Sequence, residues 1–164
     1  MFLTNIHSWR LLTLVFSKLF YCSNVWANTS KCNINKLQTV QNFACRIVSS
    51  VRKYDHVTPI RKELNQLPVE NQLYYWSATM AFKCMTDHAP EYLSSKCLKR
   101  AKVSGHSTRD SQFLNIPLFK TASGLRTFYY RIVNLWNSLD YFLKLCNSVA
   151  VFQNHLRNKL LKEL

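Results

Sequence analysis

The sequence predicts a mainly α-helical protein. Only two glycines and four prolines occur in 164 residues, and apolar residues make up 48% of the chain, which is enough for a core. Apolar side chains recur at helical spacing in several long segments. We therefore expect a helical bundle followed by a C-terminal helical extension, with at most one or two short strands near residues 112–121.

The clearest helix is predicted from Asn35 to Val51, after a largely buried helix from Trp9 to Trp26 and a turn from Lys31 to Ile34. The apolar residues of this segment are spaced to share one face. Asn42, Arg46 and Lys53 fall opposite, and Lys36 lies on the flank. The predicted inner face comprises Ile34, Leu37, Val40, Ala44, Ile47, Val48 and Val51.

Prolines mark the next helix starts. Thr58-Pro59 combines a capping hydroxyl with a first-turn proline, and Pro68 begins a long aromatic helix through Trp76 to Cys84. A brief helix follows from Pro90 to Lys96. Further along, we expect a helix from Leu125 to Leu139 with Leu125 inward, and a terminal helix capped by Ser148 with Phe152, Leu156 and Leu160 inward.

The charge favours a polyanionic partner. The formal net charge is +14 and the sequence pI is about 9.8, which favours nucleic acid first and an anionic membrane second. Basic residues, one glycine and several serines make residues 97–111 the best linker, read either as a mobile arm that touches phosphates or as a solvated loop. The predicted domains are residues 1–96, the linker 97–111, and residues 112–164.

Catalytic signatures are missing from the sequence. Two-metal nucleotidyl transfer needs carboxylates placed together, but no two of the eight acidic residues are adjacent. A Gly-rich phosphate loop and a nucleophile elbow are also absent. No cysteine pair has zinc-module spacing, and the nearest constellation is Cys84, His88, Cys97 and His106. We therefore predict no catalytic residue, no metal site and no cofactor.

The N-terminus allows another interpretation. Residues 11–16 and Val25-Trp26-Ala27 mimic the apolar region and cleavage site of a signal peptide, and Asn28-Thr29-Ser30 is a glycosylation sequon. A small secreted, cysteine-containing protein is thus an alternative. Lys18 interrupts the apolar run, which is too short and too charged to span a membrane, so an intracellular location, nuclear or cytoplasmic, is favoured.

An ordered series of short motifs covers most of the chain. It includes Tyr21-Cys22-Ser23-Asn24-Val25-Trp26, Asp55-His56-Val57-Thr58-Pro59, Ala89-Pro90-Glu91-Tyr92-Leu93 and the stretch from Phe128 to Asn137. The series resembles the region after the catalytic palm in reverse transcriptases of non-LTR (LINE-type) retrotransposons, the jockey-like branch in particular. The resemblance implies a thumb-like helical region, at residues 1–96, that grips a template–primer duplex through its backbone. It also implies a remnant of an RNA-directed DNA polymerase that lacks fingers and palm.

Three functional hypotheses follow: a remnant with weak nucleic-acid binding, a secreted protein, and a co-opted protein-interaction module. In the first, lysine and arginine contact phosphates with little regard to base sequence. Trp26, Trp76 and Trp136 are expected in the core rather than stacked on bases. The candidate nucleic-acid-binding residues are Lys36, Arg46, Arg52 and Lys53 on one helical element, and Lys99, Arg100, Lys102 and Arg109 in the linker.

Overall fold

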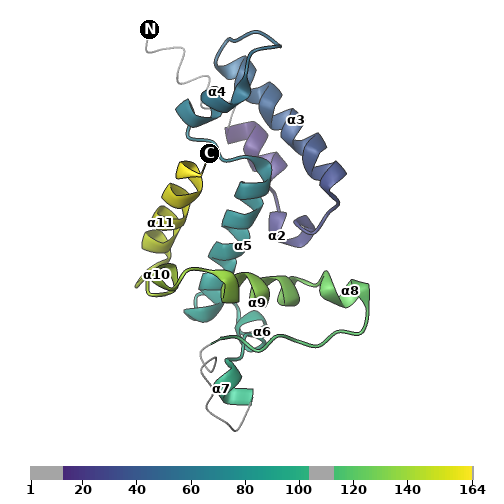
Figure 1. Cartoon of the computed structure of the whole chain (residues 1–164), viewed down its shortest axis with the longest axis vertical. Helices are drawn as coiled ribbons and strands as arrows, with labels where there is room; N and C mark the ends of the chain where they lie inside the picture. The colour runs from purple at the N-terminus through teal and green to yellow at the C-terminus, as the bar shows by residue number, and fades with distance from the viewer. Residues whose placement is uncertain (1–12, 104–112, 164) are drawn as a thin grey trace. The chain divides into compact units, whose positions relative to one another are not determined.

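The protein is mainly helical, as the sequence predicts. The computed structural model describes residues 13–103 and 113–163 (Figure 1). Within these ranges no strand forms, and the only β-type pairing is an isolated antiparallel bridge between Lys99 and Leu114. After a helical segment at residues 13–19, the helices are α2 (Ser23–Trp26), α3 (Lys31–Val48), α4 (Val57–Glu63), α5 (Val69–Met85), α6 (Glu91–Ser94), α7 (Arg100–Val103), α8 (Ala122–Leu125), α9 (Phe128–Ser138), α10 (Tyr141–Lys144) and α11 (Val149–Lys162).

The chain divides into two compact units. The first comprises residues 1–74 and 158–164, and the second comprises residues 75–157. Helices α5 and α11 therefore contribute residues to both units. The predicted division into residues 1–96, 97–111 and 112–164 remains a prediction about domains.

The first unit is built around α3 and α4, which lie side by side in Figure 1. Ala44 and Cys45 on α3 and Ile60 on α4 are buried together, and apolar residues from the first helical segment and the α3–α4 region pack against them. Burial of these side chains supplies the hydrophobic stabilisation of the unit. Burial also raises the pKa of the Cys45 thiol, against the opposing charges of Arg61 and Arg46.

A polar contact fixes the start of α5 against α3. The side chain of Gln41 is buried and donates a 2.7 Å hydrogen bond from Nε2 to the carbonyl of Leu67. The backbone N–H of Val69 donates to Gln38 Oε1 at 2.8 Å, and Gln38 Nε2 donates to Gln41 Oε1 at 2.8 Å. The two glutamines thus satisfy backbone groups on both sides of Pro68, whose nitrogen has no proton to donate.

The prediction for α3 was wrong at its start and on part of its inner face. Lys31 to Ile34 form the first turn of the helix rather than a turn before it, and the helix ends at Val48. Ala44 is buried as predicted, but Val40 is 48% and Ile47 is 49% exposed, beside Phe43 at 64%. The physical reason is that α3 has two apolar stripes, and the Gln41 side of the helix is the one that packs.

Other expectations for the N-terminal half also need correction. The helix predicted from Trp9 to Trp26 is interrupted by turns at residues 20–22, where Cys22 has a left-handed φ of 48°, and Tyr21 and Val25 are exposed. Residues 9–12 of that prediction lie outside the described ranges. Helix α4 begins at Val57, so Thr58 lies inside it and His56 occupies the N-cap position.

The second unit has an aromatic core. Phe82 stacks on Phe152 with ring centroids 4.5 Å apart, and Trp136 lies 6.3 Å from Phe82. Phe152 and Leu156 of α11 are buried, and the N–H of Val151 donates to Ser148 Oγ at 3.3 Å, as predicted for the cap of this helix. Leu160, in the first unit, is buried as predicted as well.

Two predicted core residues of this unit are instead partly exposed. Trp76 is 37% and Leu125 is 45% exposed. Leu125 ends the short helix α8, and α9 starts only at Phe128 after Thr127, whose hydroxyl accepts a hydrogen bond from the N–H of Tyr130. The single predicted helix from Leu125 to Leu139 was therefore wrong at its start, because the Thr127 cap begins a new helix.

Gly124 is required by close packing. A Cβ at this position would lie 2.6 Å from the Cβ and Cγ of Phe119. The ring of Phe119 also packs edge-on against Tyr130 of α9, with centroids 6.2 Å apart. The absent side chain of Gly124 thus gives Phe119 its place beside α9.

Candidate nucleic-acid interface

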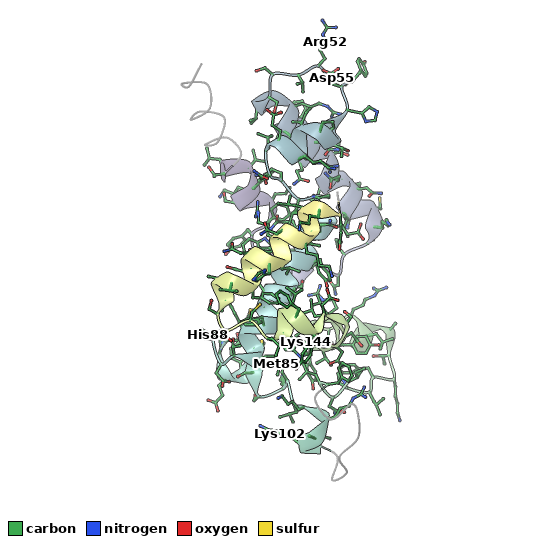
Figure 2. All side chains as sticks on the ribbon, turned by 60° about the vertical axis from the view of Figure 1, so that its left-hand side comes forward. Arg52, Asp55, Met85, His88, Lys102 and Lys144 are labelled. Atoms are coloured by element: carbon green, nitrogen blue, oxygen red, sulfur yellow. The ribbon has the colours of Figure 1, made fainter. Side chains whose placement is uncertain are left out.

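The loop between α3 and α4, residues 49–56, presents two of the predicted cations to solvent. Arg52 and Lys53 are both exposed, and Arg52 is labelled at the loop in Figure 2. The loop turns on itself because the N–H of Arg52 donates to Asp55 Oδ2 at 2.9 Å and Ser50 adopts a left-handed φ of 52°. The Lys53 ammonium lies 5.8 Å from the centre of the exposed Tyr54 ring.

The side chain of Arg46 contacts this loop and is held against the protein. It is half-buried, and one guanidinium nitrogen donates to the carbonyl of Asp55 at 3.2 Å. Its Nε is buried and makes no hydrogen bond. Arg46 thus braces the loop, and Arg52 and Lys53 are its better-presented cations, with the carboxylate of Asp55 as the opposing charge.

Lys36 lies apart from these residues. It is exposed near the start of α3. Lys36 and Arg46 are ten positions apart in the sequence, which corresponds to about 15 Å along a helix. The structure therefore separates Lys36 from the other three cations that the sequence grouped with it.

The second candidate surface is the basic segment, which we define as residues 96–103. Lys96, Lys99 and Lys102 are exposed, Arg100 is half-buried, and the segment contains no acidic residue. Lys102 lies on α7 and is labelled in Figure 2. The backbone N–H of Lys102 donates to the carbonyl of Lys99 at 2.9 Å, so the backbone of these two lysines is joined by one turn.

The basic segment is held in place by the backbone. The N–H of Arg100 donates to the carbonyl of Phe113 at 2.8 Å. The N–H of Asn115 donates to the carbonyl of Leu98, also at 2.8 Å. Between them, Leu114 exchanges two hydrogen bonds with the amide of Asn137 on α9, at 2.9 and 3.0 Å. The described part of the predicted linker is thus tied to α9, while Arg109 and His106 lie outside the described residues.

An aromatic cluster next to the segment contains a cation that the sequence prediction missed. The Lys144 ammonium lies 5.3 Å from the Phe113 ring centre and 5.9 Å from that of Trp136, and it donates to the carbonyl of Asn137 at 3.2 Å. The guanidinium carbon of Arg100 also lies 5.9 Å from the centre of the Phe113 ring. Burial lowers the pKa of Lys144, and the charge of Asp140 opposes this effect. No sequence signal could have found Lys144, because its aromatic partner Phe113 comes from a distant segment.

The acidic and metal-ligating residues are dispersed. In residues 13–103 and 113–163, no group of three or more His, Cys, Asp and Glu side chains is arranged to hold a metal ion. In these same ranges no helix combines the length and apolar character needed to cross a membrane. The arrangement offers exposed cations for charge contacts with an anionic partner.

Comparison with known proteins found no match for the chain among family models, curated proteins or solved structures.

Proposed function

We propose that this protein binds the phosphate backbone of nucleic acid with little sequence preference, as a remnant of the post-palm region of a non-LTR retrotransposon reverse transcriptase, and that it has no catalysis of its own. The basic segment carries the proposal. It presents three exposed lysines on backbone that is tied to α9, and it contains no acid. The net charge of +14 adds long-range attraction for polyanions.

Backbone contact is the mode of recognition that these residues support. Lysine ammonium groups bind phosphate as point charges, without reading base edges. The buried position of Trp136 leaves it unable to stack on a base. The charges therefore predict affinity that depends steeply on salt and weakly on sequence.

The experiment measures binding of the full chain to duplex and single-stranded oligonucleotides over a range of salt concentrations. Changing Lys99 and Lys102 to Ser should weaken binding to all sequences alike. It should also flatten the slope of log affinity against log salt by about 1.4 to 1.8, because each of the two lost phosphate contacts releases roughly 0.7 to 0.9 counterions. Changing Arg52 and Lys53 to Ser tests the α3–α4 loop in the same way.

A matched control separates local contact from overall charge. Lys120 and Lys162 are exposed and lie outside both surfaces, so changing both to Ser removes the same charge and should leave the slope nearly unchanged. Equal effects of all three double variants would reduce the proposal to a diffuse basic surface. Unchanged affinity in both test variants would refute it. Arg46 and Arg100 are kept because both pack against the fold, which would mix stability with binding.

A second candidate function, a protein-interaction module, is favoured by one observation. Val40, Phe43 and Ile47 form an exposed apolar stripe along α3, and exposed apolar patches mark interaction sites. Changing Phe43 to Ser would leave nucleic-acid affinity unchanged if the basic surfaces bind. It would lower affinity for any protein partner that uses the stripe, which distinguishes the two functions.

A further inference from the structure

A four-residue turn in the α3–α4 loop carries an exposed aromatic ring. The N–H of Asp55 donates to the carbonyl of Arg52 at 3.2 Å, and the N–H of Arg52 donates to Asp55 Oδ2 at 2.9 Å (Figure 2). The first of these contacts is the hydrogen bond that closes a β-turn. Lys53 and Tyr54 therefore occupy the two central positions of the turn, and we call residues 52–55 the Tyr54 turn.

The Tyr54 turn is anchored to α3 at both of its ends. Just before it, the N–H of Val51 donates to the carbonyl of Arg46 at 3.2 Å. At its end, the Arg46 guanidinium donates to the carbonyl of Asp55, also at 3.2 Å. Because these hydrogen bonds already order the backbone, a ligand that meets the ring of Tyr54 has little more of the chain to order.

Tyr54 is 89% exposed, more than any other aromatic residue in residues 13–103 and 113–163. A side chain this exposed adds almost nothing to the hydrophobic stabilisation of the fold. The Lys53 ammonium lies 5.8 Å from the centre of the Tyr54 ring, and Arg52 is exposed in the same turn. Proteins bind single-stranded nucleic acid with this combination, since bases stack on the ring and phosphates meet the cations.

We propose that Tyr54 stacks on an unpaired base of single-stranded nucleic acid, while Lys53 and Arg52 contact the phosphates on either side of that base. This inference rests on the proposed function, and it names single strands as the form of nucleic acid that the Tyr54 turn binds. Stacking uses the π-face that every base has, so it adds affinity without adding sequence preference.

Two features of the turn favour a single strand over a duplex. The bases of a duplex are paired and stacked on one another, and exposing one of them costs a few kcal/mol; an unpaired base offers its face to the ring without that cost. The turn itself carries two cations and the carboxylate of Asp55, which leaves a net charge of only +1. Charge alone therefore gives this turn little hold on a backbone, and the ring supplies the larger part of its contact.

The experiment compares the full chain with Tyr54→Ser on three probes: an oligothymidylate, an oligomer of abasic sites of the same length, and a DNA duplex. Tyr54→Ser should weaken binding to the oligothymidylate by about 5- to 150-fold, which corresponds to the 1–3 kcal/mol of one stacked base. Its affinity for the abasic oligomer and for the duplex should equal that of the parent. The slope of log affinity against log salt should not change, because no cation is removed.

Two control variants isolate the ring. Tyr54→Phe keeps the ring and should bind the oligothymidylate like the parent. Tyr141→Ser removes a tyrosine that is 75% exposed in the second unit and directly follows Asp140, and it should also bind like the parent. Circular dichroism should show the parent's helical content in every variant, since both tyrosines lie outside the core.

The outcomes separate this inference from the function on which it rests. Parent binding to the duplex and the abasic oligomer with a steep salt slope supports the proposed function, whatever Tyr54 does. If Tyr54→Ser then binds the oligothymidylate as tightly as the parent, or loses as much affinity for the abasic oligomer, the stacking inference is overturned alone. A parent that binds none of the three probes overturns both.

Discussion

Replacing the buried Gln41 by Met should destabilise the first unit. Gln41 is 1% exposed, and its Nε2 is 2.7 Å from the carbonyl oxygen of Leu67, a residue that is 0% exposed. Methionine has a similar length but no donor, so the Leu67 carbonyl would remain buried without its partner. An unsatisfied buried group of this kind costs about 1–3 kcal/mol, and the added apolar burial offsets part of that cost.

We therefore expect a loss of about 2 kcal/mol in the free energy of unfolding. With a urea dependence of about 1–3 kcal/mol per molar for a small protein, the unfolding midpoint should fall by roughly 1 M. Far-UV circular dichroism and tryptophan fluorescence should be followed together. Coincident transitions are required before a single free energy can be assigned to a chain with two units.

Two further variants make the prediction refutable. Thr39→Met on the exposed side of α3 should change stability by no more than about 0.5 kcal/mol. Gln41→Glu keeps the shape but turns an acceptor, and a charge, toward the Leu67 carbonyl, so it should be less stable than Gln41→Met. Equal midpoints for Gln41→Met and Thr39→Met, or a Glu variant more stable than the Met variant, would show that the hydrogen bond to Leu67 does not stabilise the unit.

Two other predictions concern burial and pH. Ala44 is 4% exposed in the α3–α4 core, so Ala44→Asp should cost several kcal/mol in urea unfolding, roughly 3 or more, as an unpaired buried charge does. Asn42→Asp should hardly change the free energy of unfolding, because the side-chain oxygen of Asn42 already accepts a hydrogen bond from Gln38. Equal losses of stability in Ala44→Asp and Asn42→Asp would mean that the two faces of α3 are misassigned. The pKa of Lys144 is lowered from 10.5 in the folded chain, chiefly by burial. At pH values between the pKa of Lys144 in the folded chain and 10.5, the unfolded chain therefore binds more protons than the folded chain. The free energy of unfolding then rises with pH. The parent should therefore gain stability relative to Lys144→Met as the pH approaches 10.5, and a constant difference between their urea midpoints would contradict this sign.

The helical class could be predicted from the sequence, but the choice of face on α3 could not. Ala44 and Val48 are spaced for one stripe, and Val40, Phe43 and Ile47 are spaced equally well for another. Periodicity reports that a helix has an apolar face and does not say which of two stripes meets the core. Gln41 decides the matter, because its side chain reaches a backbone carbonyl of a segment far along the chain.

The candidate site shows the same limit. Arg52 and Lys53, which the sequence analysis grouped on one helical element with Lys36 and Arg46, lie instead in the loop after α3 ends at Val48, and their contacts are local. The binding of Lys144 to the Phe113 ring depends on the isolated bridge and on the Asn137 amide, which join segments with no spacing signal.

The way in which the basic segment is held bears directly on how strongly it can bind. A flexible arm loses conformational entropy when it is ordered on a phosphate backbone, and this loss opposes binding. Here the backbone of Leu98 and Arg100 is already hydrogen-bonded to Phe113 and Asn115, and Arg100 lies over the Phe113 ring. Folding therefore orders the backbone of this segment before any partner arrives. Under the proposed function, Lys99 and Lys102 would meet a phosphate backbone from a segment whose own backbone is already ordered, which is why their joint replacement is the decisive test of that proposal.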